Sequence, residues 1–239
     1  MRSPAMVQLN LVSRPEVYEE TLIRSGGTPI ALSVWRAYTQ GATGPTIVFL
    51  PGTMLHPLFY EELLDALAGA GLNVVGVHFA EHGKSPRTGA LRNFEQLVQN
   101  GKDAVSYALS RFGPTVIVLG SSQGGIVAAA MAGTDDRISA VFAHNIVDVE
   151  LNETLQVTRF GWLTPLKGLV VGATRIAARL FPKLQLPASF YLEPERVFRS
   201  DLLREQYFSD PLSLKTYPLF LVASLLEAKI SRHLKCPRW

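Results

Sequence analysis

The stretch TVIVLGSSQGG, from Thr115 to Gly125, decides how this chain folds. Its β-branched apolar start is typical of a buried strand, and its small-residue end leads into an apolar helical pattern. Between the two lies a Gly-x-Ser-x-Gly pattern that runs from Gly120 to Gly124, with Ser122 at its centre. The stretch therefore predicts a strand, a sharp turn at Ser122 and a helix that begins directly after it.

A serine on such a turn is suited to nucleophilic catalysis. Glycines two positions before and after it let neighbouring backbones pass without Cβ clashes. The free N–H groups and the positive dipole end of the helix favour a developing oxyanion. We predict that Ser122 is a nucleophile and that Gly120 and Gly124 shape its turn. The backbone N–H of Gln123 is then an oxyanion donor, and a helix start with a packing role only is the alternative.

A second loop, Leu50-Pro51-Gly52-Thr53, follows the strand-like run TIVFL and precedes a helical pattern. A fold with a nucleophile turn takes its second oxyanion donor from such a loop, so we predict the backbone N–H of Thr53 for this role. An ordinary Pro-Gly turn is the alternative. His82 follows the next strand-like run, and because it precedes the serine along the chain we interpret it as a loop-shaping residue.

The first two-thirds of the chain alternates strand-like and helical patterns. The strand-like runs are continuously apolar, which favours a parallel sheet that helices bury on both faces. This alternation predicts a doubly wound α/β fold. The expected strands are 29–38, 46–50, 72–79, 115–119 and 138–146, and the expected helices are 60–70, 94–112 and 124–131.

After the last of these runs the pattern changes to helical segments broken by prolines, without a strand-like run, which predicts a helical insertion over the sheet. Within it, residues 163–181 are largely apolar and carry Lys167, Arg175 and Arg179 roughly on one side. Two alternatives stay open: this helix rests on an anionic lipid surface, or, as we favour, it buries its apolar face on the core. Residues 219–226 predict another core-facing helix.

The composition excludes several classes of protein. Hydrophobic residues make up 47% and charged residues 18%, and the net charge of +3 without a Lys/Arg run gives no reason to expect a nucleic acid partner. Cys236 is the only cysteine, so neither an internal disulfide nor a cysteine-based metal site is expected, and we expect no cofactor. We find no signal-like segment and no apolar run of membrane-spanning length, which predicts a soluble, cytoplasmic protein.

Four segments carry a resemblance to a known family. Leu50 to Gly52 is similar to a Leu-His-Gly motif, His82 to Ser85 to His-Gly-x-Ser, Gly120 to Gly125 to Gly-His-Ser-Met-Gly-Gly, and Tyr207 to Leu212 to Tyr-x-Ser-Asp-Pro-Leu. In these motifs the chain resembles the monoacylglycerol lipase and lysophospholipase-like branch of the α/β-hydrolases, which is of the serine aminopeptidase S33 type. It departs from that branch where His, Asp, His and Met are replaced by Pro51, His78, Ser121 and Gln123.

The resemblance implies an α/β-hydrolase fold with a helical cap, and a serine hydrolase that cleaves small-molecule acyl or lipid esters. Together with the change of pattern it implies a core at 1–148, a cap at 149–232 and the start of the next core strand at 233–239. In the family, a Gly-x-x-Asp after that strand supplies the triad acid and a later loop supplies the histidine. The sequence ends at Trp239, so we expect the final core strands to be missing.

The acid and the base of a triad therefore need other candidates. The downstream histidines are His144, which we interpret as a core histidine in a strand, and His233, which we interpret as a solvated helix-end residue. Asp148 is the candidate acid, although a loop or helix-capping role is favoured. Asp210 is expected to begin a turn before Pro211. A non-catalytic binding or interaction module of this fold is the alternative function, and a peptidase or dehalogenase is a third.

Overall fold

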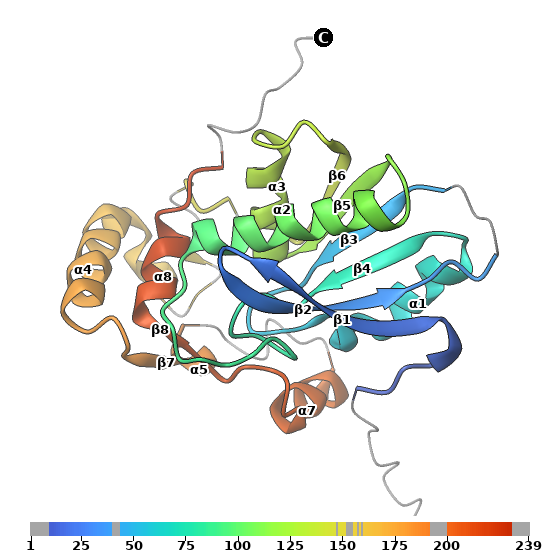
Figure 1. Cartoon of the computed structure of the whole chain (residues 1–239). Coiled ribbons are helices and arrows are strands. Elements are labelled where there is room, and N and C mark those ends of the chain that lie inside the picture. Colours follow the sequence, from blue (N-terminus) through green and yellow to red (C-terminus); the bar gives the residue numbers. More distant parts are fainter. Residues whose placement is uncertain are drawn as a thin grey trace, which may run out of the picture.

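The computed structural model describes residues 10–39, 44–146, 148–151, 155–156, 158, 160–191 and 200–230. Its centre is a six-stranded sheet with the strand order β1-β2-β4-β3-β5-β6 (Figure 1). Strands β3 to β6 are mutually parallel, whereas β2 runs antiparallel to both β1 and β4. Their bounds are β1 Tyr18–Ser25, β2 Thr28–Trp35, β3 Thr46–Leu50, β4 Asn73–Val77, β5 Val116–Ser121 and β6 Ile138–His144.

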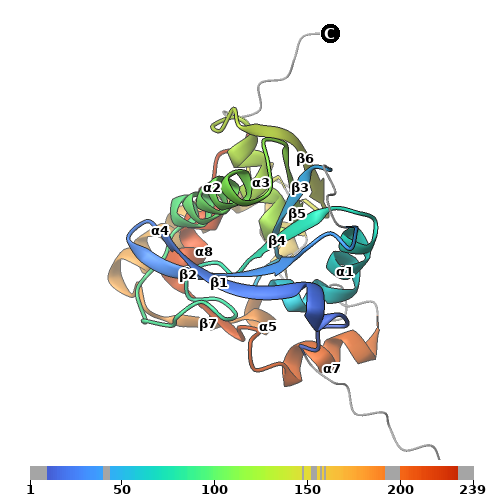
Figure 2. The same cartoon turned by 45° about the vertical axis from the view of Figure 1, so that its right-hand side comes forward.

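Helices cover both faces of this sheet because successive residues of its inner strands are apolar and point to opposite sides. In β3, Val48 belongs to one buried cluster and Phe49 to another. The first cluster includes α2 (Phe94–Arg111) and α3 (Gln123–Ala132), and the second includes α1 (Glu61–Gly69). Figure 2 shows α2 and α3 on one side of the sheet and α1 on the other. The predicted α/β fold is therefore confirmed.

Strand β6 is an outermost strand of the sheet among the described residues, and it is poorly covered. Phe142 is 59% exposed, and His144 is exposed as well. The interpretation of His144 as a core histidine is therefore wrong. An apolar sequence pattern favours burial, but a strand at the edge of a sheet is buried only where a further element packs against it.

The described residues after β6 form several helices and one small sheet. The helices are η4 (Gly161–Leu166), α4 (Lys167–Leu180), α5 (Ala188–Tyr191), α7 (Asp201–Ser209) and α8 (Leu219–Leu226). β7 (Gln185–Pro187) and β8 (Thr216–Pro218) pair antiparallel. The expectation that this region has no strand is wrong, because three-residue strands that include a proline leave no alternating pattern in the sequence.

Helices α4 and α8 pack together and differ in how much of their apolar surface they bury (Figure 1). Ala178 of α4 lies in a small cluster with Leu219 and Ala223 of α8, and α8 buries its apolar face as expected. By contrast, Leu169 of α4 is 72% exposed. The favoured expectation that α4 buries its apolar face on the core is therefore wrong. None of the helices described is long and apolar enough to cross a bilayer.

Candidate active site around Ser122

Ser122 occupies the single residue between β5 and α3. Its backbone has a φ of 51° and a ψ of −118°, a conformation that non-glycine residues rarely adopt and that costs about 1–3 kcal/mol. The backbone N–H of Ser122 donates to the carbonyl of His144 at 2.8 Å. The last residue of β6 therefore holds the strained turn in place.

The glycines on either side of Ser122 allow close contacts that no other residue would permit. A Cβ at Gly120 would lie 2.2 Å from the carbonyl oxygen of Gly124, and a Cβ at Gly124 would lie 2.0 Å from the carbonyl oxygen of Leu50. The second contact places the loop after β3 directly against the turn. A Cβ at Gly52 of that loop would lie 3.6 Å from the Cβ of Ser122.

Two backbone amides beside Ser122 have no hydrogen-bond partner within the described part of the chain. They are the N–H groups of Thr53 and Gln123, the pair that the sequence predicts as oxyanion donors. The amides on each side of Thr53 are engaged: Gly52 donates to Tyr60 Oη at 3.2 Å and Met54 donates to Tyr217 Oη at 2.8 Å.

His82 is a fully hydrogen-bonded histidine in the core. Its Nδ1 lies 2.8 Å from the carbonyl oxygen of Ala80 and its Nε2 lies 2.8 Å from Tyr217 Oη. Burial lowers the pKa of His82 to about 4, so the ring is neutral at pH 7 and Nδ1, which faces a carbonyl, carries the proton. With both nitrogens engaged, His82 shapes its loop.

A buried pair that the sequence did not reveal joins the loop after β3 to the segment after α7. His56 Nε2 lies 2.5 Å from Asp210 Oδ2, and the two side chains are 0% and 1% exposed. Burial by itself raises the pKa of Asp210, but the hydrogen bonds from His56, Asn10 and Ser213 outweigh it and hold that pKa well below its usual range. Asp210 also accepts the N–H of Leu212, which forms the expected turn around Pro211.

Among the described residues, the candidates for acid and base make no side-chain hydrogen bond to Ser122. Asp148 is exposed, and its Oδ1 accepts the backbone N–H of Glu150 at 2.9 Å, as a turn-forming aspartate does. Among the described residues, no histidine is hydrogen-bonded to Ser122 Oγ or to Asp148, and His233 lies outside them. The described residues also contain no group of three or more His, Cys, Asp or Glu that would hold a metal ion.

Sequence reasoning also missed two tyrosines of the site. Tyr60 lies at the end of η2 (Pro57–Tyr60), and Tyr217 lies in β8, 163 positions from the amide of Met54 that it binds. Neither residue carries a local signal, because a tyrosine before a helix or in a short strand is ordinary. The nearest signal was the position of Tyr60 close behind the Gly52 loop.

Comparisons with solved structures show the same fold in known hydrolases. The monoacylglycerol lipase of Paleococcus ferrophilus is 22% identical, with a TM-score of 0.66 over 85% of this chain and 71% of that chain. A soluble variant of monoglyceride lipase from Saccharomyces cerevisiae, in complex with a substrate analog, is 14% identical, with a TM-score of 0.68 over 98% and 74%. A thermostable carboxyl esterase from Bacillus coagulans is 13% identical, with a TM-score of 0.65 over 89% and 72%. No curated protein matches the sequence.

A sequence match identifies the family of this chain. A family model described as serine aminopeptidase, S33, matches residues 42–233, which include the loop after β3, the turn at Ser122 and the segment around Tyr217. The resemblance stated from the motifs, and with it the assignment to α/β-hydrolase-fold serine hydrolases, is confirmed at this level. The chain belongs to the serine aminopeptidase S33 family.

Proposed function

We propose that this chain is a serine hydrolase that cleaves carboxylic esters of acyl or lipid type, with Ser122 as its nucleophile. The observation that carries this proposal is the strained backbone of Ser122 beside the two unpartnered amides of Thr53 and Gln123. Strain of this kind persists where the surrounding structure imposes it, and it concentrates at functional sites. Buried or half-buried amides without partners are uncommon unless a ligand completes them.

In the proposed reaction Ser122 Oγ attacks the carbonyl carbon of the ester. A C–O bond forms, and the carbonyl electron pair moves onto the oxygen, where the N–H groups of Thr53 and Gln123 bind the resulting oxyanion. Collapse of this intermediate breaks the bond to the alcohol, which leaves with a proton, and leaves an acyl group on Ser122. Water then releases the acid by the same route. This chemistry requires no cofactor, but it requires a base for the Ser122 proton.

We propose the division of the chain that the sequence suggested, with a core at 1–148 and a cap at 149–232. The contacts of Tyr217 and Asp210 with the loop after β3 support a region that lies over the turn at Ser122. Residues 233–239 lie outside the described residues. For Asp148 we favour the turn-forming role, and the role of triad acid stays the alternative.

We also propose that the cap contacts a lipid surface through α4. Exposed apolar side chains recur along η4 and α4 every three or four residues, at Trp162, Leu166, Leu169, Ala173, Ile176 and Leu180. We call these six residues the α4 stripe. A helix that presents such a stripe and lacks acidic residues suits an anionic interface. No Asp or Glu occurs between residues 161 and 190, and Arg175, Arg179 and Lys183 are exposed.

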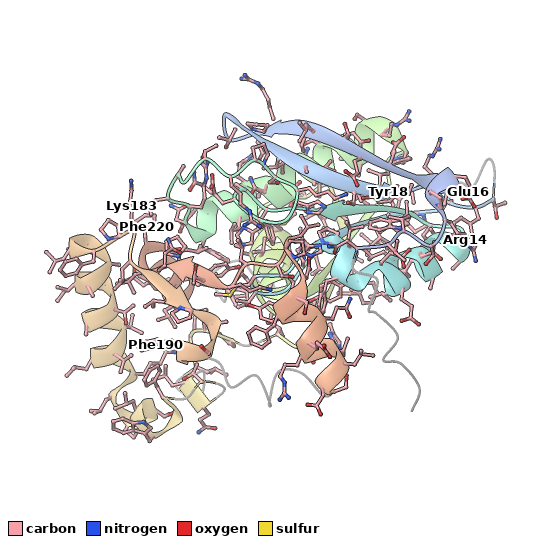
Figure 3. All side chains as sticks on the ribbon, turned by 90° about the horizontal axis from the view of Figure 1, so that it is seen from below. Arg14, Glu16, Tyr18, Lys183, Phe190 and Phe220 are labelled. Atoms are coloured by element: carbon pink, nitrogen blue, oxygen red, sulfur yellow. The ribbon has the colours of Figure 1, made fainter. Side chains whose placement is uncertain are left out.

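The surroundings of the α4 stripe fit the same proposal. Figure 3 shows Lys183 and Phe190 at the end of the molecule that α4 occupies, far from Arg14 and Tyr18. Lys167 does not join the basic residues, because it is buried and its Nζ donates to the carbonyl of Val149 at 2.6 Å. Of the three basic residues that the sequence places on one side of α4, only Arg175 and Arg179 are therefore exposed.

A fluorophosphonate probe tests the proposed function. The wild-type chain is expected to be labelled at Ser122, and Ser122→Ala is expected to lose labelling completely. Ser139→Ala, which removes an exposed hydroxyl from β6, is the matched control and should be labelled as the wild type is. A folded wild-type chain that the probe does not label would favour the alternative, a binding or interaction module. The supporting observation for it is that, among the described residues, no histidine side chain is hydrogen-bonded to Ser122 Oγ.

A further inference from the structure

In the loop after β3, the amide of Thr53 has no partner among the described residues, whereas the amides on each side of it are bound. Gly52 N–H is bound to Tyr60 Oη, Met54 N–H is bound to Tyr217 Oη, and Leu55 N–H is bound to the carbonyl of Gly52. Thr53 N–H, in the middle, donates to no other described residue. Two phenolic oxygens from outside the loop therefore hold the peptide units on both sides of Thr53.

Tyr217 is placed to act as an acceptor for this loop. It is 1% exposed, and its Oη lies 2.8 Å from Met54 N, 2.8 Å from His82 Nε2 and 3.2 Å from Gln123 Oε1. His82 already uses the proton on Nδ1 toward Ala80, so its Nε2 is an acceptor and attracts the phenolic proton of Tyr217. The oxygen lone pairs of Tyr217 are then left to accept the Met54 N–H.

The hydroxyl of Tyr217 keeps its proton across the ordinary range of pH. Burial raises the pKa of Tyr217 well above its usual range, and the hydrogen bonds from Met54 and with Gln123 offset only part of this. A protonated phenol has one proton to donate, and His82 Nε2 and Gln123 Oε1 both face it as acceptors, while the phenolic oxygen accepts the Met54 N–H. The same hydroxyl touches the loop of one proposed oxyanion donor and the side chain of the other, Gln123.

Tyr60 holds the opposite side of the loop. Its Oη accepts the N–H of Gly52 at 3.2 Å and donates to Ser121 Oγ at 3.4 Å, next to the nucleophile. Burial raises the pKa of Tyr60 as well. A Cβ at Gly52 would lie 2.9 Å from that oxygen, so the contact requires glycine at this position. The ring of Tyr60 packs edge-on against Phe49, with the centroids 4.8 Å apart.

We infer that Tyr217 and Tyr60 are positioning residues that fix the loop after β3 by binding the amides on each side of Thr53, so that the Thr53 N–H alone is presented to the substrate. This inference rests on the proposed function of Ser122. An oxyanion donor contributes most when it is held at its final position before charge develops, because no reorganisation is then needed during the reaction. Tyr217 adds a contribution from the region after β6 to a site whose other parts lie before it.

The test compares Tyr217→Phe, Tyr60→Phe and the control Tyr18→Phe, which loses a hydroxyl bound to Glu20 and Ser33 away from the loop. Labelling rates with the fluorophosphonate and steady-state hydrolysis of 4-nitrophenyl butyrate are measured. Because loss of an oxyanion donor typically lowers kcat by about 100- to 1,000-fold, misplacing one is expected to lower kcat and the labelling rate by about tenfold to a hundredfold. KM is expected to stay within about twofold, and Tyr18→Phe should match the wild type.

Amide hydrogen exchange gives a readout that does not depend on activity. Tyr217→Phe is expected to speed exchange at Met54, Tyr60→Phe to speed it at Gly52, and Thr53 should exchange fast in every variant. If the wild type is not labelled but these exchange rates change as expected, the proposed function has failed and the positioning of the loop stands. Wild-type labelling rates in both tyrosine variants, or unchanged exchange at Met54 and Gly52, would overturn the inference.

Discussion

Helices α3 and α4 are both rich in small and apolar residues, yet one is buried and the other is exposed. In α3 every residue from Gln123 to Met131 is buried, whereas in α4 only Lys167 and Ala178 are. The difference lies in side-chain size at the contact surface. The glycines and alanines of α3 let it approach the sheet closely enough to support the strained serine. By contrast, the apolar contact of α4 with α8 uses Ala177 and Ala178, and the larger side chains of Leu169, Ile176 and Leu180 stay exposed. Helix α3 therefore supports the turn at Ser122, whereas α4 exposes apolar side chains to solvent.

The largest expected effect is a difference in stability between a Gly→Ala substitution in α3 and one in α4. Gly124→Ala is expected to lower the free energy of unfolding by about 3 kcal/mol or more, because the new Cβ would lie 2.0 Å from a backbone oxygen that cannot move aside. Gly172→Ala in α4 meets no atom within 4 Å and is expected to raise that free energy by about 1 kcal/mol through helix propensity. Urea denaturation measures both, and similar effects in the two variants would contradict the comparison.

The next largest expected effect is a pH dependence of the free energy of unfolding, which arises from the buried residue His82. Folded His82 takes up a proton only near pH 4, whereas an unfolded histidine does so near 6.5, so the unfolded chain binds more protons in between. The free energy of unfolding is therefore expected to fall as the pH drops from about 6.5 to 4, by about 3 kcal/mol from this residue.

His82→Gln is expected to weaken that pH dependence, and Ser139→Ala, which changes no titratable group, is expected to leave it unchanged. Burial also lowers the pKa of His78, with nearby positive charge adding to the effect, so a residual dependence of the same sign should remain in His82→Gln. Denaturation midpoints measured at half-unit pH steps give the slopes. An identical slope in the wild type and His82→Gln would show that the buried ring is not responsible.

The smallest expected effect on stability comes from the exposed side. Leu169→Glu changes one residue of the α4 stripe that is 72% exposed, so the free energy of unfolding should change by less than about 0.5 kcal/mol. Binding to vesicles of phosphatidylcholine and phosphatidylglycerol, measured by sedimentation, should weaken at least about tenfold, because a carboxylate replaces buried apolar area at the interface. Leu22→Glu, 61% exposed on β1, should bind as the wild type does. Equal binding by all three proteins would refute the lipid-surface proposal.

The core and the turn were predictable because their signals are local. Strands β3 and β5 can be recognised in the sequence as short apolar runs. The spacing of Gly120, Ser122 and Gly124 indicates a sharp turn at the serine. By contrast, β1 was not predicted: its residues Tyr18–Ser25 mix charged and apolar side chains on a strand with one exposed face.

The rest of the site depends on contacts between distant parts of the chain. His56 and Asp210 are 154 positions apart, and Met54 and Tyr217 are 163 apart, so no window of sequence contains both partners. The burial of His144 was misjudged for a related reason, because it depends on what packs beside β6 and not on the strand itself.

The contacts of Tyr217 and Asp210 have a consequence for engineering this chain. If residues 149–232 were exchanged for those of a relative to alter specificity, Met54 and His82 would lose their shared phenol and His56 would lose its carboxylate. A buried histidine without a partner and an unbound amide would each lower the free energy of unfolding of the chimeric protein. Any transplanted region would have to bring its own tyrosine and aspartate at matching places, so substrate preference and reaction geometry cannot be varied independently here.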